Sequence, residues 1–175
     1  MLPVWLSWKE AHQKIGSLVT RITIIFRTAM STEQQLLQAK DIFQKVFALQ
    51  FPIGQYIVVG GAVLAMHGIK NTHDIDIVGS PELLEKLRQD DEWHTANRPS
   101  GEPGVCKGCI EVYPDVNCPA HHLEFRDLLE RGEAIQGIPC ASINDVLLFK
   151  KGYGREKDLG DIERTEQWLE MRMAP

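Results

Sequence analysis

Two aspartates and two glycines lie close together in the sequence, and their types suit metal and phosphate chemistry. Asp74 and Asp76 stand two residues apart in an alternating polar and apolar segment. In a strand, such residues project from one face, about 6–7 Å apart along the chain. Two carboxylates in this arrangement suit Mg²⁺, which takes its other ligands from water and substrate phosphates. The pair therefore points to phosphoryl transfer assisted by one or two metal ions.

The glycine pair, Gly60 and Gly61, follows the apolar, β-branched segment 56–59, which predicts a buried strand. A helix-compatible segment over 62–67 comes next. Bare backbone N–H groups at such a turn can approach a phosphate closely. Each pair alone is a common pattern, but the two pairs at this spacing together indicate a nucleotide site.

Signals for helices and strands alternate along the rest of the chain. We expect further strands at 74–78, 109–113 and 138–140, helices at 81–89, 122–131, 143–150 and from 158 onward, and a surface loop over 94–108. This order predicts a single α/β domain in which helices flank a mixed sheet.

The N-terminal residues 1–29 fit this pattern poorly. Thr32 and Gln35 form a capping-box pattern, and apolar residues recur at helical spacing from Leu36 to about Gln50. We therefore divide the chain into an extension, residues 1–29, and a domain, residues 30–175. Either Met30 is the true start, or residues 1–29 are an arm that packs on the domain.

The composition excludes several classes of protein. With 175 residues, 43% of them hydrophobic and 25% charged, the chain can bury a core and is not expected to be disordered. No apolar run approaches the roughly 18 residues of a membrane span. Four cysteines without a secretory signal predict a cytoplasmic protein with reduced thiols. The net charge of −5 gives no general attraction to nucleic acid, although cations at an acidic site would reverse its local sign.

The segment GGAVLAMHGIKNTHDIDI resembles the signature of the nucleotidyltransferase superfamily with a DNA polymerase β-like fold. It is most similar to the small Gly-Gly-Ala variants that include AbiEii-type toxins. The family pattern combines a Gly-Gly turn, a basic residue, a threonine and Asp-x-Asp, which here are Gly60, Gly61, Lys70, Thr72, Asp74 and Asp76. Arginine is commoner at the basic position, so Lys70 keeps the charge and loses the bidentate grip on phosphate.

A second block resembles the C-terminal motif of the same small proteins, so that the resemblance covers about residues 33–169. It contains Lys150, Arg155, Lys157, Asp158 and Asp161. The resemblance implies that the three basic residues neutralise a triphosphate or the pyrophosphate leaving group. The alternative is a solvated helix end, with Arg155 and Lys157 paired to the two aspartates.

In such enzymes a third carboxylate comes from the neighbouring strand. Glu111 is the candidate because strand-forming apolar residues flank it, and Asp115 is the alternative. Most members have aspartate here, so the longer Glu111 departs from the pattern. The resemblance thus implies Mg²⁺ or Mn²⁺ at a carboxylate set, and nucleotide contacts from Gly60, Gly61, Thr72, Lys150, Arg155 and Lys157.

The implied activity is transfer of a nucleoside monophosphate from a nucleoside triphosphate to a hydroxyl of a protein, an RNA or a small molecule. A toxin–antitoxin or phage-defence setting, with a protein partner, is part of the resemblance. Two alternatives stay open. One is a catalytically silent nucleotide- or partner-binding module on the same fold, and the other is a zinc-stabilised interaction domain built on Cys106, Cys109, Cys118 and His121.

Overall fold

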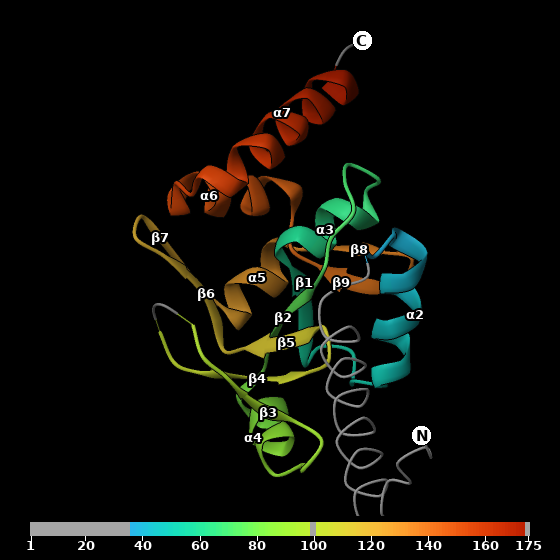
Figure 1. Cartoon of the computed structure of the whole chain (residues 1–175), viewed down its shortest axis with the longest axis vertical. Helices are drawn as coiled ribbons and strands as arrows, with labels where there is room; N and C mark the ends of the chain where they lie inside the picture. The colour runs from blue at the N-terminus through green and yellow to red at the C-terminus, as the bar shows by residue number, and fades with distance from the viewer. Residues whose placement is uncertain (1–35, 99–100, 174–175) are drawn as a thin grey trace, which may run out of the picture. The chain divides into compact units, whose positions relative to one another are not determined.

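A seven-stranded mixed sheet forms the centre of the protein in the computed structural model, which describes residues 36–98 and 101–173 (Figure 1). The strands lie in the order β3-β4-β5-β2-β1-β9-β8. Their bounds are β1 Tyr56–Val59, β2 Ile75–Gly79, β3 His94–Ala96, β4 Gly104–Lys107, β5 Ile110–Tyr113, β8 Glu133–Ile135 and β9 Ile138–Cys140. A separate hairpin consists of β6 (Asp115–Cys118) and β7 (His121–Glu124).

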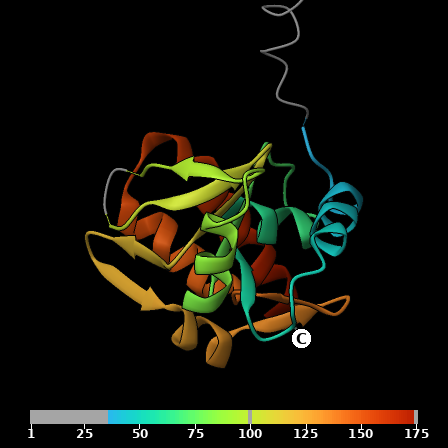
Figure 2. The same cartoon turned by 90° about the horizontal axis from the view of Figure 1, so that it is seen from below.

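Six α-helices and one 3-10 turn accompany these strands in the described residues. They are α2 Ala39–Leu49, α3 Gly60–Met66, α4 Pro81–Arg88, α5 Phe125–Arg131, α6 Ile143–Tyr153, η1 Glu156–Asp158 and α7 Leu159–Met173. Helix α2 and the β6–β7 hairpin lie on opposite sides of the molecule, and α6 packs beside α7 (Figures 1 and 2). The predicted α/β domain with helices around a mixed sheet is confirmed.

The two faces of the central strands carry different side chains. Strand β2 runs parallel to β5 and antiparallel to β1. Ile75 and Ile77 of β2 and Val112 of β5 are completely buried on one face. Because side chains alternate along a strand, Asp76 and Glu111 project from the other face. Burial of the apolar face thus directs the acidic residues toward a common surface.

Local signals placed several elements correctly. Ser80 and Ser142 cap α4 and α6, each accepting a hydrogen bond from the backbone N–H three residues later, at 3.2 and 3.1 Å. Helix α2 ends at Leu49, close to the predicted end near Gln50, and Gln50 adopts the left-handed conformation. The capping box at Thr32, the alternative start at Met30 and the extension 1–29 lie outside the described residues.

The predicted loop over 94–108 is wrong, because β3 and β4 lie within it. Its glycine content serves close packing: a Cβ on Gly104 would lie 2.2 Å from the carbonyl oxygen of Val112. Strands β3 and β4 form through backbone pairing with each other and with β5. Segments this short carry no apolar pattern that would predict such pairing. Strand β8 was not predicted for the same reason.

Two predicted helices begin too early. Residues 36–38 are not helical, because Leu37 exchanges two backbone hydrogen bonds with Thr72, at 2.6 and 3.1 Å. Helix α5 starts at Phe125 rather than near residue 122, because residues 121–124 pair with β6. Its capping box, formed by Glu124 and Asp127, replaces the expected start.

No helix within 36–98 and 101–173 combines the length and the apolar character needed to cross a bilayer.

Candidate functional site

A cleft of about 1000 Å³ brings the two sequence motifs together. One wall comes from the β1–α3 junction, the segment before β2, and strands β2 and β5. The other comes from α6, η1 and the start of α7. Every residue predicted to bind Mg²⁺ or nucleotide lines this cleft, namely Gly60, Gly61, Thr72, Asp74, Asp76, Glu111, Lys150, Arg155 and Lys157.

Three acidic residues on the sheet wall form what we call the carboxylate cluster: Asp74, Asp76 and Glu111. Asp76 of β2 and Glu111 of β5 are direct register partners on neighbouring parallel strands. Burial, together with the charges of Asp74 and Glu111, raises the pKa of Asp76 from 3.8 to about 7. Lys150 and Arg155 oppose this shift without cancelling it. The cluster therefore holds more negative charge than its surroundings compensate.

The glycine pair lies directly against this cluster. Gly60 has a φ of +64°, and a Cβ on it would lie 2.8 Å from a carboxylate oxygen of Asp76. A Cβ on Gly61 would lie 2.9 Å from the hydroxyl oxygen of Thr72. Any side chain at Gly60 would thus meet both backbone strain and a steric clash. The glycines give the backbone its closest approach to the carboxylates.

Thr72 connects the glycine turn to the first aspartate. Its buried hydroxyl donates a hydrogen bond of 3.0 Å to Asp74 Oδ1, and its backbone pairs with Leu37. Asp74 itself is exposed. Thr72 therefore orients Asp74 in the structure, which is a different placement from the nucleotide contact implied by the resemblance.

Lys150 joins the two motifs on the opposite wall. Only 8% of it is exposed, and its ammonium group donates to Asp158 Oδ1 at 2.9 Å and to Asp161 Oδ2 at 2.8 Å. Lys70, from the first motif, donates to the same oxygen of Asp161, also at 2.8 Å. A single carboxylate oxygen therefore holds lysines that lie 80 positions apart in the chain.

Two arginines extend these contacts into what we call the ion-pair network: Lys70, Lys150, Arg155, Arg164, Asp158 and Asp161. Arg155 lies 2.6 Å from Asp158, and Arg164 lies 2.9 Å from Asp161. The predicted pairing of Arg155 with an acidic neighbour is thus present, but the aspartates are buried rather than solvated, with 3% and 4% exposed. Lys157 is exposed at the cleft and has no ion pair within the described part of the chain.

The network lowers the pKa values of its acids. Burial alone would raise the pKa of Asp161, but hydrogen bonds from Lys150 and Lys70 outweigh it and bring the pKa to about 2. Burial also acts against ionisation of Asp158, where hydrogen bonds from Arg155 and Lys150 lower the pKa. Both aspartates are therefore ionised and paired at neutral pH.

The two candidates for the third carboxylate occupy different surroundings. Glu111 stands beside Asp76 and accepts a hydrogen bond of 2.6 Å from the hydroxyl group of Tyr113. Asp115 begins β6 and pairs with Arg98 at 2.6 Å. The register places Glu111, rather than Asp115, next to the Asp-x-Asp pair.

Among residues 36–98 and 101–173, no three histidine, cysteine or acidic side chains lie in a geometry that could hold a metal ion. This covers the cysteine–histidine set, in which Cys106 and Cys109 belong to the β4–β5 hairpin and Cys118 and His121 to the β6–β7 hairpin. It covers the carboxylate cluster as well, whose members gather on one wall without forming a closed ligand shell.

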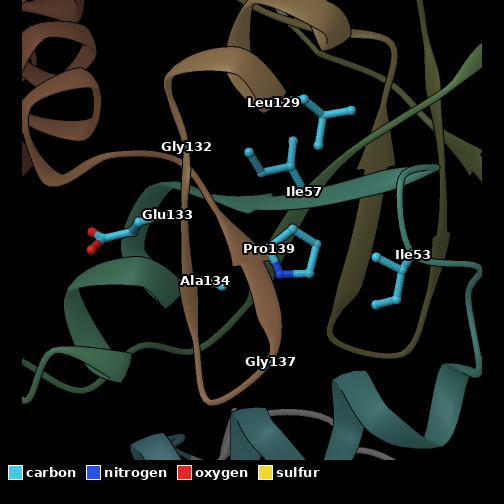
Figure 3. Close-up of a pocket in the computed structure, with 8 residues that line it drawn as sticks. All are labelled: Ile53, Ile57, Leu129, Gly132, Glu133, Ala134, Gly137 and Pro139. Atoms are coloured by element: carbon cyan, nitrogen blue, oxygen red, sulfur yellow. The ribbon is translucent and has the colours of Figure 1, made fainter.

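A second pocket, of about 280 Å³, lies near the β8 edge of the sheet (Figure 3). Its walls are mainly apolar and include Ile53, Ile57, Leu129 and Pro139. Its acidic residue, Glu133, extends away from these side chains and contacts His67 at 3.1 Å. The pocket brings together no groups suited to acid–base or phosphate chemistry.

Some residues of the cleft were not selected from the sequence. Tyr113 stands two residues after Glu111 on the same strand, so its spacing alone could have indicated a shared face. Arg98 offered no such signal, because it lies in the segment expected to be a loop. The sequence motif contains Asp158 and Asp161, but only the folded chain makes Asp161 a common acceptor for Lys70 and Lys150.

Comparison with known proteins gives no match to a protein-family model, to a curated protein or to a solved structure.

Proposed function

We propose that the protein is a nucleotidyltransferase of polymerase β-like fold, which transfers a nucleoside monophosphate from a nucleoside triphosphate to an acceptor hydroxyl. The observation that carries the proposal is the register pairing of Asp76 with Glu111, against which the Gly60 turn closes. Acidic residues on neighbouring strands beside a glycine turn, facing a cationic wall, suit a triphosphate and its counter-ions.

The donor types of the carboxylate cluster suit Mg²⁺ or Mn²⁺ because they are all oxygens, although the described side chains do not stand in the geometry of a metal site. Burial and the charges of Asp74 and Glu111 raise the pKa of Asp76, and a cation beside it would offset both effects. When bound, the ion would supply positive charge next to the phosphates.

The protein's own residues would perform the remaining tasks. Gly60 and Gly61 would let the phosphates approach the backbone, while Lys70 and Lys150 would neutralise the leaving pyrophosphate. Glu111 would accept the proton of the acceptor hydroxyl at the oxygen not held by Tyr113. The hydroxyl oxygen would form a bond to the α-phosphorus as the bond to pyrophosphate breaks.

A labelled-nucleotide assay tests the proposal. The protein is incubated with each α-labelled ribonucleoside triphosphate and MgCl₂, with cell extract as the source of protein, RNA and small-molecule acceptors. We expect label transfer and pyrophosphate release, and a loss of at least about 100-fold in Asp76→Asn and in Glu111→Gln. Asp115→Asn is the matched control and should lose less. Equal activity in wild type and Asp76→Asn would contradict the proposed nucleotidyltransferase activity.

One observation favours a second candidate, a nucleotide-binding module without catalysis. Lys150 and Arg155 are already engaged by Asp158 and Asp161, so their charges are partly used within the protein. This candidate predicts saturable binding of a triphosphate without pyrophosphate release, both in wild type and in Asp76→Asn.

The physiological setting implied by the resemblance, a toxin or phage-defence protein with a partner, belongs to the same proposal. Transfer to a defined component of the extract would identify the acceptor class.

A further inference from the structure

We propose that Tyr113 is a positioning residue, which restrains the Glu111 carboxylate beside Asp76 for cation binding, and that Arg98 buttresses Tyr113. The inference depends on the proposed function, since it assigns a role within the same site. It concerns residues that neither the sequence motifs nor the resemblance selected.

The side chains of Glu111 and Tyr113 share one face of β5. Glu111 and Tyr113 are two residues apart on this strand, so both side chains project toward the cleft. The hydroxyl group of Tyr113 donates a hydrogen bond of 2.6 Å to Glu111 Oε2. This contact leaves Oε1 of the carboxylate available to a ligand.

Arg98 supports the ring of Tyr113. The guanidinium carbon of Arg98 lies 5.3 Å from the centre of the Tyr113 ring. Arg98 is itself anchored, because it donates to the carbonyl oxygens of Glu102 at 2.9 Å and Asp115 at 3.0 Å and pairs with the Asp115 carboxylate. A fixed cation thus restrains the ring, and the ring restrains the carboxylate.

A glutamate that binds a cation needs such a restraint more than an aspartate does. Glutamate has one more rotatable bond than aspartate, so it loses more conformational freedom when it binds a cation in one geometry. Partners that orient a metal ligand commonly change metal affinity by about 10–100-fold when they are removed. Tyr113 would therefore let a glutamate serve at a position where a shorter aspartate would need less support.

The protein offers a matched control in Tyr153. Its hydroxyl group also donates a hydrogen bond, of 2.8 Å, but to the backbone carbonyl oxygen of Asn117. An arginine, Arg155, also lies over its ring, at 4.5 Å from the centre. Tyr153→Phe therefore removes a comparable hydrogen bond at the same cleft without touching a carboxylate.

The test is calorimetric titration of the full-length protein with Mn²⁺ alone, in wild type, Tyr113→Phe, Tyr153→Phe, Asp76→Asn, Glu111→Gln and the double variant Tyr113→Phe/Glu111→Gln. We expect Tyr113→Phe to weaken Mn²⁺ binding about 10-fold. Tyr153→Phe should change it less than about 2-fold. In the Glu111→Gln background, adding Tyr113→Phe should also change binding less than about 2-fold, because Tyr113 acts through Glu111.

The outcomes separate this inference from the proposed function. Mn²⁺ binding that is unchanged or tighter in Tyr113→Phe, with a clear loss in Asp76→Asn, would overturn the positioning role and leave the function standing. An equal effect of Tyr113→Phe in both backgrounds would also overturn it. No Mn²⁺ binding by the wild type would overturn both. If Tyr113→Phe is unstable, Arg98→Lys serves as the test variant in its place. It keeps the charge but loses the planar group, so it should also weaken Mn²⁺ binding.

Discussion

The two charged regions of the cleft use the same residue type in opposite ways. In the carboxylate cluster, the partly buried Asp76 lies near two other acids, and its pKa rises to about 7. In the ion-pair network, the buried Asp161 receives hydrogen bonds from two lysines, and its pKa falls to about 2. Burial acts in the same direction on both, so the neighbouring charges decide the outcome. The network is satisfied within the protein, whereas the cluster needs a positive ligand.

This difference predicts opposite effects of mutation on stability. Residues of the network should stabilise the fold, and Asp76 should cost stability until a ligand binds.

Lys150→Met should have the largest effect, lowering the free energy of unfolding by about 3 kcal/mol. It removes a cation that pairs with both Asp158 and Asp161, which are buried. Urea denaturation measures the change. Lys157→Met is the control, because Lys157 is exposed, and it should stay within about 0.5 kcal/mol of wild type. Similar stability of the two variants would contradict a structural role for the network.

Gly60→Ala should be the next most damaging substitution, with a loss of about 2 kcal/mol or more. Alanine at Gly60 meets both a positive φ and the carboxylate of Asp76. Gly68→Ala provides the comparison, since Gly68 has a φ of +75° but a Cβ added there would meet no atom within 4 Å. Its loss should be about 1 kcal/mol, from backbone strain alone. Thermal unfolding of both variants would show whether the contact with Asp76 adds to the strain; equal losses would mean that it does not.

Asp76→Asn should stabilise the metal-free protein at pH 8 by about 1–2 kcal/mol, which is about 3–6 °C in melting temperature. The pKa of Asp76 is raised by folding, so its contribution to stability is fully present below pH 3.8 and is lost as the pH rises through about 7. The advantage of the variant should therefore shrink between pH 8 and pH 5. A variant less stable than wild type at pH 8 would show that the cluster is compensated within the protein.

The smallest effect is expected from acid titration of Asp161. Its pKa is lowered by folding from 3.8 to about 2, so the stability it contributes is present above pH 3.8 and is lost as the pH falls toward 2. After allowance for screening, the contribution is on the order of 1 kcal/mol. The gap in stability between wild type and Asp161→Asn should therefore narrow between pH 4 and pH 2. A constant gap would place the stabilisation elsewhere in the network.

Local sequence patterns predicted much of this arrangement. The β-branched run at 56–59 and the Ser80 and Ser142 caps located their elements closely, because these signals act within a few residues. The predicted strand over 74–78 placed Asp76 correctly on β2, but Asp74 lies just before the strand, which begins at Ile75. Glu111 was predicted to lie beside the aspartate pair because strand-forming apolar residues flank it, and the register of β2 with β5 agrees with that prediction.

Other features depended on contacts that no short window contains. The β3 and β4 strands form through pairing across the sheet, and their glycines looked like loop residues. The β6–β7 hairpin displaced the expected start of α5 because pairing of residues 121–124 outweighed helix propensity. Arg98 joined the cleft only because its segment folds back to Asp115 and Tyr113.

The sequence by itself determined which residues have the chemistry of a nucleotide site, because residue type and alternation along a strand are local properties. The tertiary structure alone decided how their charges are compensated. It placed Lys70 and Lys150 on one oxygen of Asp161 and left Asp76 among other acids. Electrostatic energy depends on distance and burial in space rather than on separation along the chain, which is why only the folded protein distinguishes the paired aspartates from the unpaired ones.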